Sequence, residues 1–232
     1  MLEGVLGQSA GSLTHLDLDR NALGSDGVRR LAGVLAQCTA LRYLSLSCNN
    51  IARAAQVALS EALAHCRALN HLDLRFNRIR AGGAKSLAGV LGQCAALAHL
   101  NLSHNDIGHV GTKWLAGVLA QFTALAHLDL SDNNIGPGGA GKLAGVLTQC
   151  TALAHLDLSD NGIGPAGAGK LARVLGQCPA LELLDLSYNS IGSVGNRRLY
   201  SCCTGTLEVL LGGESEEEED DAEEEDDEEE ED

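Results

Sequence analysis

The chain has 232 residues, 45% of them hydrophobic but only 3% aromatic, so its core must be built mainly from Leu, Val, Ile, Ala and Cys. Its formal net charge is −15, yet residues 214–232 alone contain 17 of the 31 acids and no base. The remainder, with 14 acids and 16 bases, is near neutral. A strongly acidic segment disfavours nucleic acid and anionic membranes as direct partners.

Residues 1–12 resemble the helical half of a repeat with one residue inserted near Ser12, so we expect a partial N-terminal repeat there. They lack the basic region and the long apolar region of a signal peptide. No later stretch approaches the roughly 18 consecutive apolar residues of a membrane-spanning helix, so no membrane span is expected.

From residue 13 the sequence repeats one unit with a period of 28 residues, and residues 13–211 are expected to form one solenoid. Each of about seven units begins with the pattern L-x-x-L-x-L-x-x-N, as in LTHLDLDRN and LAHLDLSDN. The asparagines that close these segments are Asn21, Asn49, Asn77, Asn105, Asn133, Asn161 and Asn189. Within each segment leucine alternates with polar residues, which predicts a short strand with one buried face. Strands of this kind in parallel would form one long sheet.

The Asn and the residues after it are expected to turn the chain from strand to helix. An Asn side chain pairs readily with nearby backbone groups, and a Gly usually follows three and six residues later. Pro137 and Pro165 occupy a slot that suits the first turn of a helix. We expect the helix to bury Leu143, Val146 and Leu147 and their equivalents, and each repeat to be stabilised by stacking on its neighbours.

Five of the eight cysteines share one phase of the period. They are Cys38, Cys66, Cys94, Cys150 and Cys178, and Phe122 takes the same phase in the remaining unit. A position that accepts either Cys or Phe is a buried apolar slot rather than half of a disulfide. This use of cysteine indicates a reducing compartment, the cytosol or the nucleus. No CxxC pair occurs, so we expect no zinc site, and no cofactor is indicated.

This pattern resembles the ribonuclease-inhibitor-like class of leucine-rich repeats, which is also found in NOD-like receptors and in the Ran GTPase-activating protein. The resemblance covers residues 13 to about 200. It implies an α/β leucine-rich-repeat solenoid shaped like a horseshoe, with parallel strands on the concave face and helices on the convex face. The motif is specific for this fold and leaves the function open.

The period breaks near the C-terminus. The segment TLEVLL, residues 206–211, could form a short eighth strand that closes the core. Residues 212–232 are predicted to be a disordered acidic tail, because they contain no aromatic residue and many like charges. Ser215, followed by four glutamates, resembles a site for an acidophilic kinase, and the alternative is an unmodified tail that aids solubility.

Side-chain parity predicts which residues face a partner, because alternate residues of a strand point to opposite sides. The third-position row, which we call the ring row, is His15, Tyr43, His71, His99, His127, His155 and Leu183. The fifth-position row, the acid row, is Asp17, Ser45, Asp73, Asn101, Asp129, Asp157 and Asp185. Arg75 belongs to the seventh position, and Phe76 and Tyr188 to the eighth. We expect these rows to form a protein-binding concave face.

The ring row allows three interpretations. Adjacent strands lie roughly 4.8 Å apart, so neighbouring imidazoles could stack or touch carboxylates. The row could be a pH-sensitive binding strip, because His titrates near neutrality. It could bind a transition metal adventitiously between His and Asp. In the third interpretation, duplication copied one repeat whose surface His is merely tolerated.

A basic stripe is expected where the convex helices begin. Its members, eight or nine residues after each Asn, are Arg29, Arg30, Lys85, Lys113, Lys142, Lys170, Arg197 and Arg198. The stripe could be a solvated helix face, or it could hold the acidic tail.

The first functional hypothesis is a non-enzymatic scaffold that binds a protein partner on the concave face. No nucleophile elbow, P-loop, dinucleotide motif or HExxH sequence appears. We expect a monomer with no cofactor.

The second hypothesis is a GTPase activator, because repeats of this type followed by an acidic tail resemble the Ran GTPase-activating protein. That family carries a catalytic Arg within N-x-I-G-x-E-x-x-R, and residues 21–29 are similar, with Leu23 and Asp26 in place of Ile and Glu. The resemblance implies that Arg29 would supply positive charge to the transition state of a small GTPase.

A third hypothesis is binding of histones or other basic proteins through the acidic tail. Acidic nuclear phosphoproteins also join leucine-rich repeats to such a tail, so the similarity is one of architecture.

Overall fold

The structure is a computed structural model that describes residues 9–202 and 206–212. Strands and helices alternate along these residues. The strands are β1 (His15–Asp17), β2 (Tyr43–Ser45), β3 (His71–Asp73), β4 (His99–Asn101), β5 (His127–Asp129), β6 (His155–Asp157), β7 (Leu183–Asp185) and β8 (Glu208–Leu210). The helices are α2 (Gly24–Leu35), α3 (Arg53–Leu63), α4 (Arg80–Leu91), α5 (Gly108–Leu119), α6 (Gly136–Leu147), α7 (Gly164–Leu175) and α8 (Gly192–Cys202).

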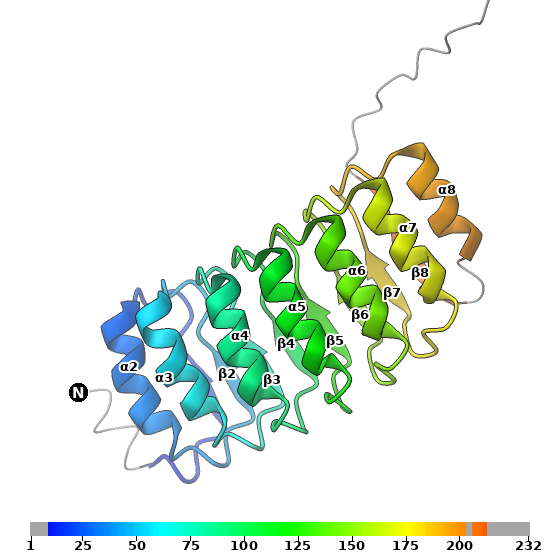
Figure 1. Cartoon of the computed structure of the whole chain (residues 1–232). Coiled ribbons are helices and arrows are strands. Elements are labelled where there is room, and N and C mark those ends of the chain that lie inside the picture. The colour runs from blue at the N-terminus through cyan, green and yellow to red at the C-terminus, as the bar shows by residue number, and fades with distance from the viewer. Residues whose placement is uncertain (1–8, 203–205, 213–232) are drawn as a thin grey trace, which may run out of the picture.

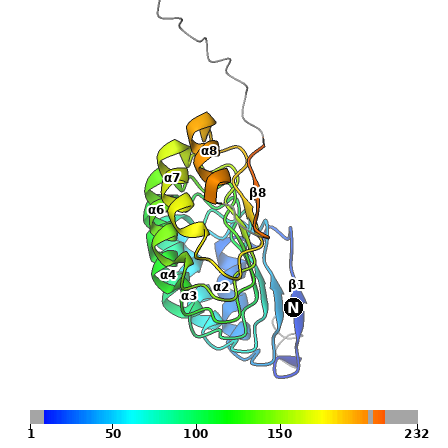
Figure 2. The same cartoon turned by 90° about the vertical axis from the view of Figure 1, so that its right-hand side faces the viewer.

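The strands form one parallel sheet whose order follows the sequence, β1 to β8. Equivalent residues of successive repeats lie opposite one another, so His99 pairs with His127 and Leu100 with Leu128. The helices form a second layer on one side of the sheet (Figures 1 and 2). Neighbouring strands are roughly 4.8 Å apart whereas packed helices are about 10 Å apart, so the stack curves with its strands inside. The predicted solenoid and its parallel sheet are confirmed.

The core lies between the two layers and consists mainly of leucine. Leu100, Leu128 and their equivalents on the other inner strands are buried. On α6, Leu143 and Leu147 are buried as predicted, whereas Val146 is half-buried at the border of the core. Each repeat therefore covers the leucines of the next, which is why the array is stabilised by stacking.

The repeat asparagines form a buried ladder of hydrogen bonds. The side-chain oxygen of Asn133 accepts the backbone N–H groups of Asn105 and Ile107 at 3.2 and 3.3 Å. Its amide donates to three carbonyls, among them that of Leu102 in the preceding repeat at 2.9 Å. In the inner repeats the Asn side chain thus bonds the backbone where the chain turns away from its strand. Asn21 differs, because it is exposed and its side chain donates only to the carbonyl of Asp19.

Two glycine positions serve the turn from strand to helix. Gly136 has φ +62°, a left-handed conformation that favours glycine. Gly139 lies where a Cβ would come within 2.5 Å of Cγ2 of Ile135. Arg80 occupies the first of these positions in its repeat with φ +58°, so its backbone is strained there.

The cysteine phase of the repeat is the apolar slot that the sequence predicts. Cys66 and Cys94 are buried as free thiols, and Phe122 is buried in the same slot. Burial raises the pKa of the Cys66 thiol to about 12, so it stays protonated and unreactive.

Both ends of the chain extend beyond the described residues. The predicted helical segment 1–12 is described only from Ser9, and the predicted acidic tail and Ser215 lie outside the described residues. The predicted eighth strand is present as β8, which pairs in parallel with β7. None of the described helices has the length and apolar character that crossing a membrane requires.

Candidate functional site

The ring row forms a continuous stack along the concave face. From His15 to His155 the distances between successive ring centroids are 4.1, 4.6, 5.5, 4.3 and 4.4 Å. Only the step from His71 to His99 is tilted, and Leu183 ends the row. The in-register sheet brings equivalent side chains within ring-stacking distance. Contact between neighbouring rings is expected from the sequence, and in the structure it continues over the six strands from β1 to β6.

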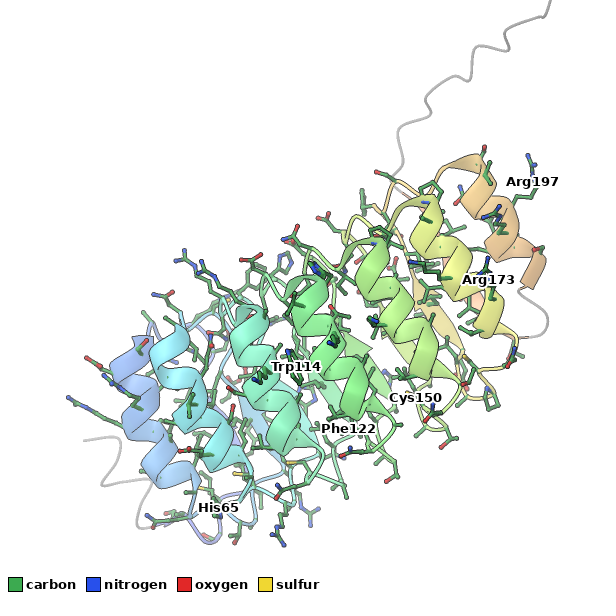
Figure 3. The ribbon with its side chains drawn as sticks, viewed as in Figure 1. His65, Trp114, Phe122, Cys150, Arg173 and Arg197 are labelled. Atoms are coloured by element: carbon green, nitrogen blue, oxygen red, sulfur yellow. The ribbon has the colours of Figure 1, made fainter. Side chains whose placement is uncertain are left out.

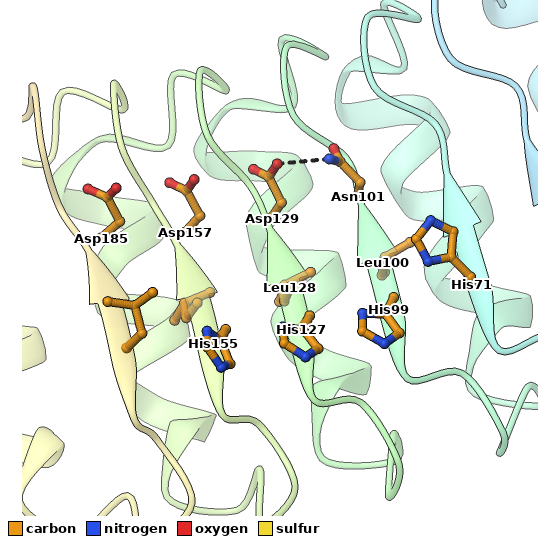
Figure 4. Close-up of a pocket in the computed structure, with 12 residues that line it drawn as sticks. His71, His99, Leu100, Asn101, His127, Leu128, Asp129, His155, Asp157 and Asp185 are labelled. Carbon is orange, nitrogen blue, oxygen red and sulfur yellow. Dashed lines mark hydrogen bonds between the residues drawn. The ribbon is translucent and has the colours of Figure 1, made fainter. Parts of the chain in front are cut away.

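The acid row runs beside the rings at the ends of the strands (Figure 4). Each carboxylate of the last three members accepts the backbone N–H of the residue two positions later, as Asp157 does from Ser159 at 2.8 Å. Asp129 also accepts a hydrogen bond from the amide of Asn101 at 2.9 Å. These bonds fix the carboxylates in place on β5, β6 and β7.

Between the two rows the surface is hollowed by about 260 Å³. The hollow spans β3 to β7 (Figure 4), and its lining contains four His, three Asp and one Asn side chain but no Lys or Arg. Its lining residues are His71, His99, Leu100, Asn101, His127, Leu128, Asp129, His155, Leu156, Asp157, Leu183 and Asp185. The hollow therefore offers the edges of stacked rings on one side and, on the other, carboxylates with no Lys or Arg among the lining residues.

Partial burial perturbs both rows. Burial lowers the pKa values of His71, His99 and His127, and the neighbouring imidazoles lower them further at His99 and His127. Burial raises the pKa of Asp157, with smaller contributions from Asp129 and Asp185, although hydrogen bonds from Ser159 oppose the rise. Near neutral pH the imidazoles of His71, His99 and His127 are therefore mainly uncharged.

The N-terminal part of the concave face differs from the hollow. Asp73, predicted to face a partner, is only 8% exposed and lies 3.4 Å from the guanidinium of Arg75. Ser45 in the same row is also buried. The accessible acid row is therefore Asp129, Asp157 and Asp185 on the later strands, with Asp17 exposed separately at the first strand.

A smaller cluster lies at the edge of the concave face. Phe76, 49% exposed, stacks on His104 at 3.9 Å between ring centroids, and Nδ1 of His104 contacts the carboxylate of Asp132. The predicted binding set contained Phe76 and Tyr188 but not His104 or Asp132, although all four share the eighth position. Tyr188 is 64% exposed and does not join this cluster.

Arg29 does not belong to the concave face. It lies on α2 in the helix layer, exposed, and pairs with Asp26 three residues earlier in the same helix. Within residues 9–202 and 206–212, no three His, Cys, Asp or Glu side chains gather in a way that could hold a metal ion.

Comparison with protein families gives seven matches along the chain to a model described as a leucine-rich repeat. They cover residues 12–32, 37–53, 65–88, 93–115, 123–144, 149–172 and 177–196. No curated protein matches the sequence significantly.

Two solved structures share the fold. An internalin from Listeria monocytogenes is 20% identical with a TM-score of 0.61, over 93% of this chain and 52% of the internalin. The tropomodulin C-terminal domain from Caenorhabditis elegans is 11% identical with a TM-score of 0.54, over 64% of this chain and 90% of that domain. The chain thus spans about half the length of the internalin, and at these identities the likeness shows the fold alone.

Proposed function

Because this chain belongs to the leucine-rich-repeat family, we propose that it is a scaffold whose concave face binds a protein partner, with the hollow over β3 to β7 as the contact centre. Solenoids of this kind use their extended concave surfaces for binding. We also propose that its 28-residue units, each with a helix, belong to the ribonuclease-inhibitor-like class of leucine-rich repeats.

The observation that carries the proposal is the hollow with its two rows. The stack of partly buried imidazoles presents a continuous row of ring edges, whose nitrogens can donate or accept hydrogen bonds from a partner. The carboxylates of Asp129, Asp157 and Asp185 lie beside it without a Lys or Arg among the lining residues. These features support a partner segment that contributes Lys or Arg side chains to the hollow.

Selection from a library of short random peptides on the full chain tests this proposal. We expect the selected peptides to be enriched in Lys or Arg. Reversing the charge of the acid row with Asp157→Lys and Asp185→Lys should weaken the best peptide by about tenfold or more, since close opposite charges dominate such contacts.

A matched control is available on the other layer. Arg29→Glu and Arg30→Glu change two exposed charges on α2, and they should leave the peptide affinity within about twofold. Peptide binding that is unaffected by Asp157→Lys and Asp185→Lys would contradict the proposal. Such a peptide would be held elsewhere, for example by the acidic residues 214–232, as the histone-binding hypothesis predicts.

GTPase activation is a second candidate, favoured by the sequence of residues 21–29 and by the exposure of Arg29 on α2. The guanidinium would leave Asp26 to reach the nucleotide of a bound small GTPase. GTP hydrolysis by a Ran-type GTPase should then be accelerated by the intact chain and not by Arg29→Ala. Arg30→Ala is the control at the adjacent exposed position. Equal slow hydrolysis with all three proteins would reject this function.

A further inference from the structure

The helix layer carries charge of one sign over most of its length. The five helices from α4 to α8 contain eight Lys or Arg residues and no Asp or Glu. These bases are Arg80, Lys85, Lys113, Lys142, Lys170, Arg173, Arg197 and Arg198, and all are exposed. Figure 3 shows Arg173 and Arg197 projecting from α7 and α8. We call this set the basic helix face.

The fold leaves most of this charge uncompensated. Within the described residues, the ion pairs of the basic helix face comprise only Arg80 with Asp106, at 3.5 Å. Lys170 donates a hydrogen bond to the carbonyl of Pro137 on the neighbouring helix at 3.1 Å. Lys85 lies over the ring of Trp114 at 4.8 Å from its centroid. None of these contacts removes a positive charge from the C-terminal helices α6 to α8.

The chain leaves the described fold next to these helices. The carbonyl of Gly212, the last described residue, accepts a hydrogen bond from the backbone N–H of Tyr188 at 2.9 Å. Tyr188 lies in the turn just before α8 begins at Gly192. The described chain therefore ends at the edge of the solenoid where α8 starts, two residues before the acidic residues 214–232, which contain 17 acids and no base.

Charge complementarity selects between the two faces that this segment could reach. On the concave side the last strands carry the carboxylates of Asp185 and Asp157, which repel it. On the helix side the last two helices carry Arg197, Arg198 and Lys170. We propose that the acidic residues 214–232 dock on the basic helix face of their own chain, over α6 to α8.

The length of the segment is sufficient. Nineteen residues span at most about 60 Å when fully extended, and packed helices lie about 10 Å apart. The segment can therefore pass over α8, α7 and α6 with length to spare, whereas α2 at the far end of the solenoid is out of easy reach. Docking occupies the basic helix face and leaves the concave hollow open to a partner.

Carbodiimide cross-linking of the full chain, followed by mass spectrometry, tests the proposal. The reagent joins a carboxylate to an amine in direct contact, and the four lysines of the chain all lie on α4 to α7. We expect amide links from residues 214–232 to Lys170 and Lys142, fewer to Lys85 on the more distant α4, and loss of the links in high salt.

Three variants make the test specific. Arg197→Glu with Arg198→Glu should reduce the links to Lys170 several-fold, whereas Arg29→Glu with Arg30→Glu on the distant α2 should leave them unchanged. His155→Lys places an amine on the concave face and should acquire no link to residues 214–232. Equal linking of this concave lysine, or links found only between two molecules, would overturn the proposal.

Small-angle X-ray scattering gives a second reading on the unmodified chain. A free acidic segment contracts as salt screens its self-repulsion, whereas a docked segment is released by salt and extends. We therefore expect the radius of gyration of the full chain to increase from low to high salt. A radius that decreases or stays constant would contradict docking.

Discussion

The repeat asparagines, which we call the Asn row, recur with the same period as the ring row. The Asn row is buried in the inner repeats, whereas the ring row lies at the surface. Asn49, Asn77 and Asn133 are fully buried, and each is held by hydrogen bonds that join adjacent repeats. The imidazoles of the ring row are partly exposed and contact one another mainly by stacking.

This difference separates folding from recognition within one repeat. The Asn row, buried in every unit but the first, admits no other residue type in seven units, whereas the ring row accepts Tyr43 and Leu183 as well as His. We infer that the Asn row fixes the stability of the solenoid and that the ring row is free to serve a partner. The following changes test that separation, beginning with the largest expected effect.

Asn133→Ala should be the most damaging of these changes. It removes five hydrogen bonds and leaves buried backbone groups without partners, which costs roughly 3–5 kcal/mol in the free energy of unfolding. Urea denaturation measures the loss. The matched control is Asn21→Ala, which removes one exposed hydrogen bond and should cost less than about 1 kcal/mol. Similar losses in the free energy of unfolding for both variants would contradict the claim that the buried hydrogen bonds of the Asn row stabilise the solenoid.

Gly139→Ala should come next, because the new Cβ would lie 2.5 Å from Cγ2 of Ile135 and 3.3 Å from Cβ of Thr112. We expect a loss of about 1–3 kcal/mol from overpacking. Gly145→Ala on the same helix meets no atom within 4 Å and should stabilise the fold by up to about 1 kcal/mol. The melting temperatures of the two variants test this difference. A melting temperature of Gly139→Ala equal to that of Gly145→Ala would show that the helix has room for a side chain at residue 139.

Asn196→Ala should stabilise the chain. Within the described part of the chain, Oδ1 of Asn196 is buried without a hydrogen-bond partner, whereas Ala84, Ala140 and Ala168 hold the equivalent position in other repeats. Removing the unpaired acceptor should raise the free energy of unfolding by about 1 kcal/mol. A lower melting temperature for the variant would show that the amide makes a stabilising contact.

The ring row should make stability depend on pH, with the smallest effect of the four. Burial lowers the pKa values of His71, His99 and His127 in the folded state. The contribution of these neutral imidazoles to the free energy of unfolding is therefore fully present above the pKa of His in the unfolded chain, about 6.5. It is lost as the pH falls through the lower folded values, so the free energy of unfolding should decrease between about pH 7.5 and pH 5.

His99→Tyr with His127→Tyr should flatten this dependence. Tyr43 shows that the position accepts a ring that does not titrate in this range, because burial, with smaller contributions from nearby Asp carboxylates, raises its pKa further. An unchanged pH profile in the double variant would assign the dependence to other groups.

The repeat period made much of the fold predictable. Alternating leucines in a fixed phase locate the strands, and an Asn or a Cys that recurs in one phase must occupy equivalent surroundings. The stack of rings follows from the same periodicity, because a parallel in-register sheet places equivalent side chains side by side.

Other features of the site depend on which side chains meet across repeats. Side-chain parity indicates the face of the sheet on which Asp73 lies but not how exposed it is. Its exposure is reduced by Arg75 and by buried neighbours. The contact of His104 with Asp132 requires two different residue types at equivalent positions of adjacent repeats. The hollow over β3 to β7 reflects the depth of side chains on several strands, which no local pattern encodes.

The separation of the two rows is tested most directly by measuring stability and peptide binding on the same proteins. His99→Ala with His127→Ala should keep the free energy of unfolding within about 1 kcal/mol of the original chain. The same variant should weaken the peptide selected on the concave face by about tenfold. Loss of stability as large as that of Asn133→Ala, or undiminished peptide binding, would contradict the assignment of the ring row to recognition.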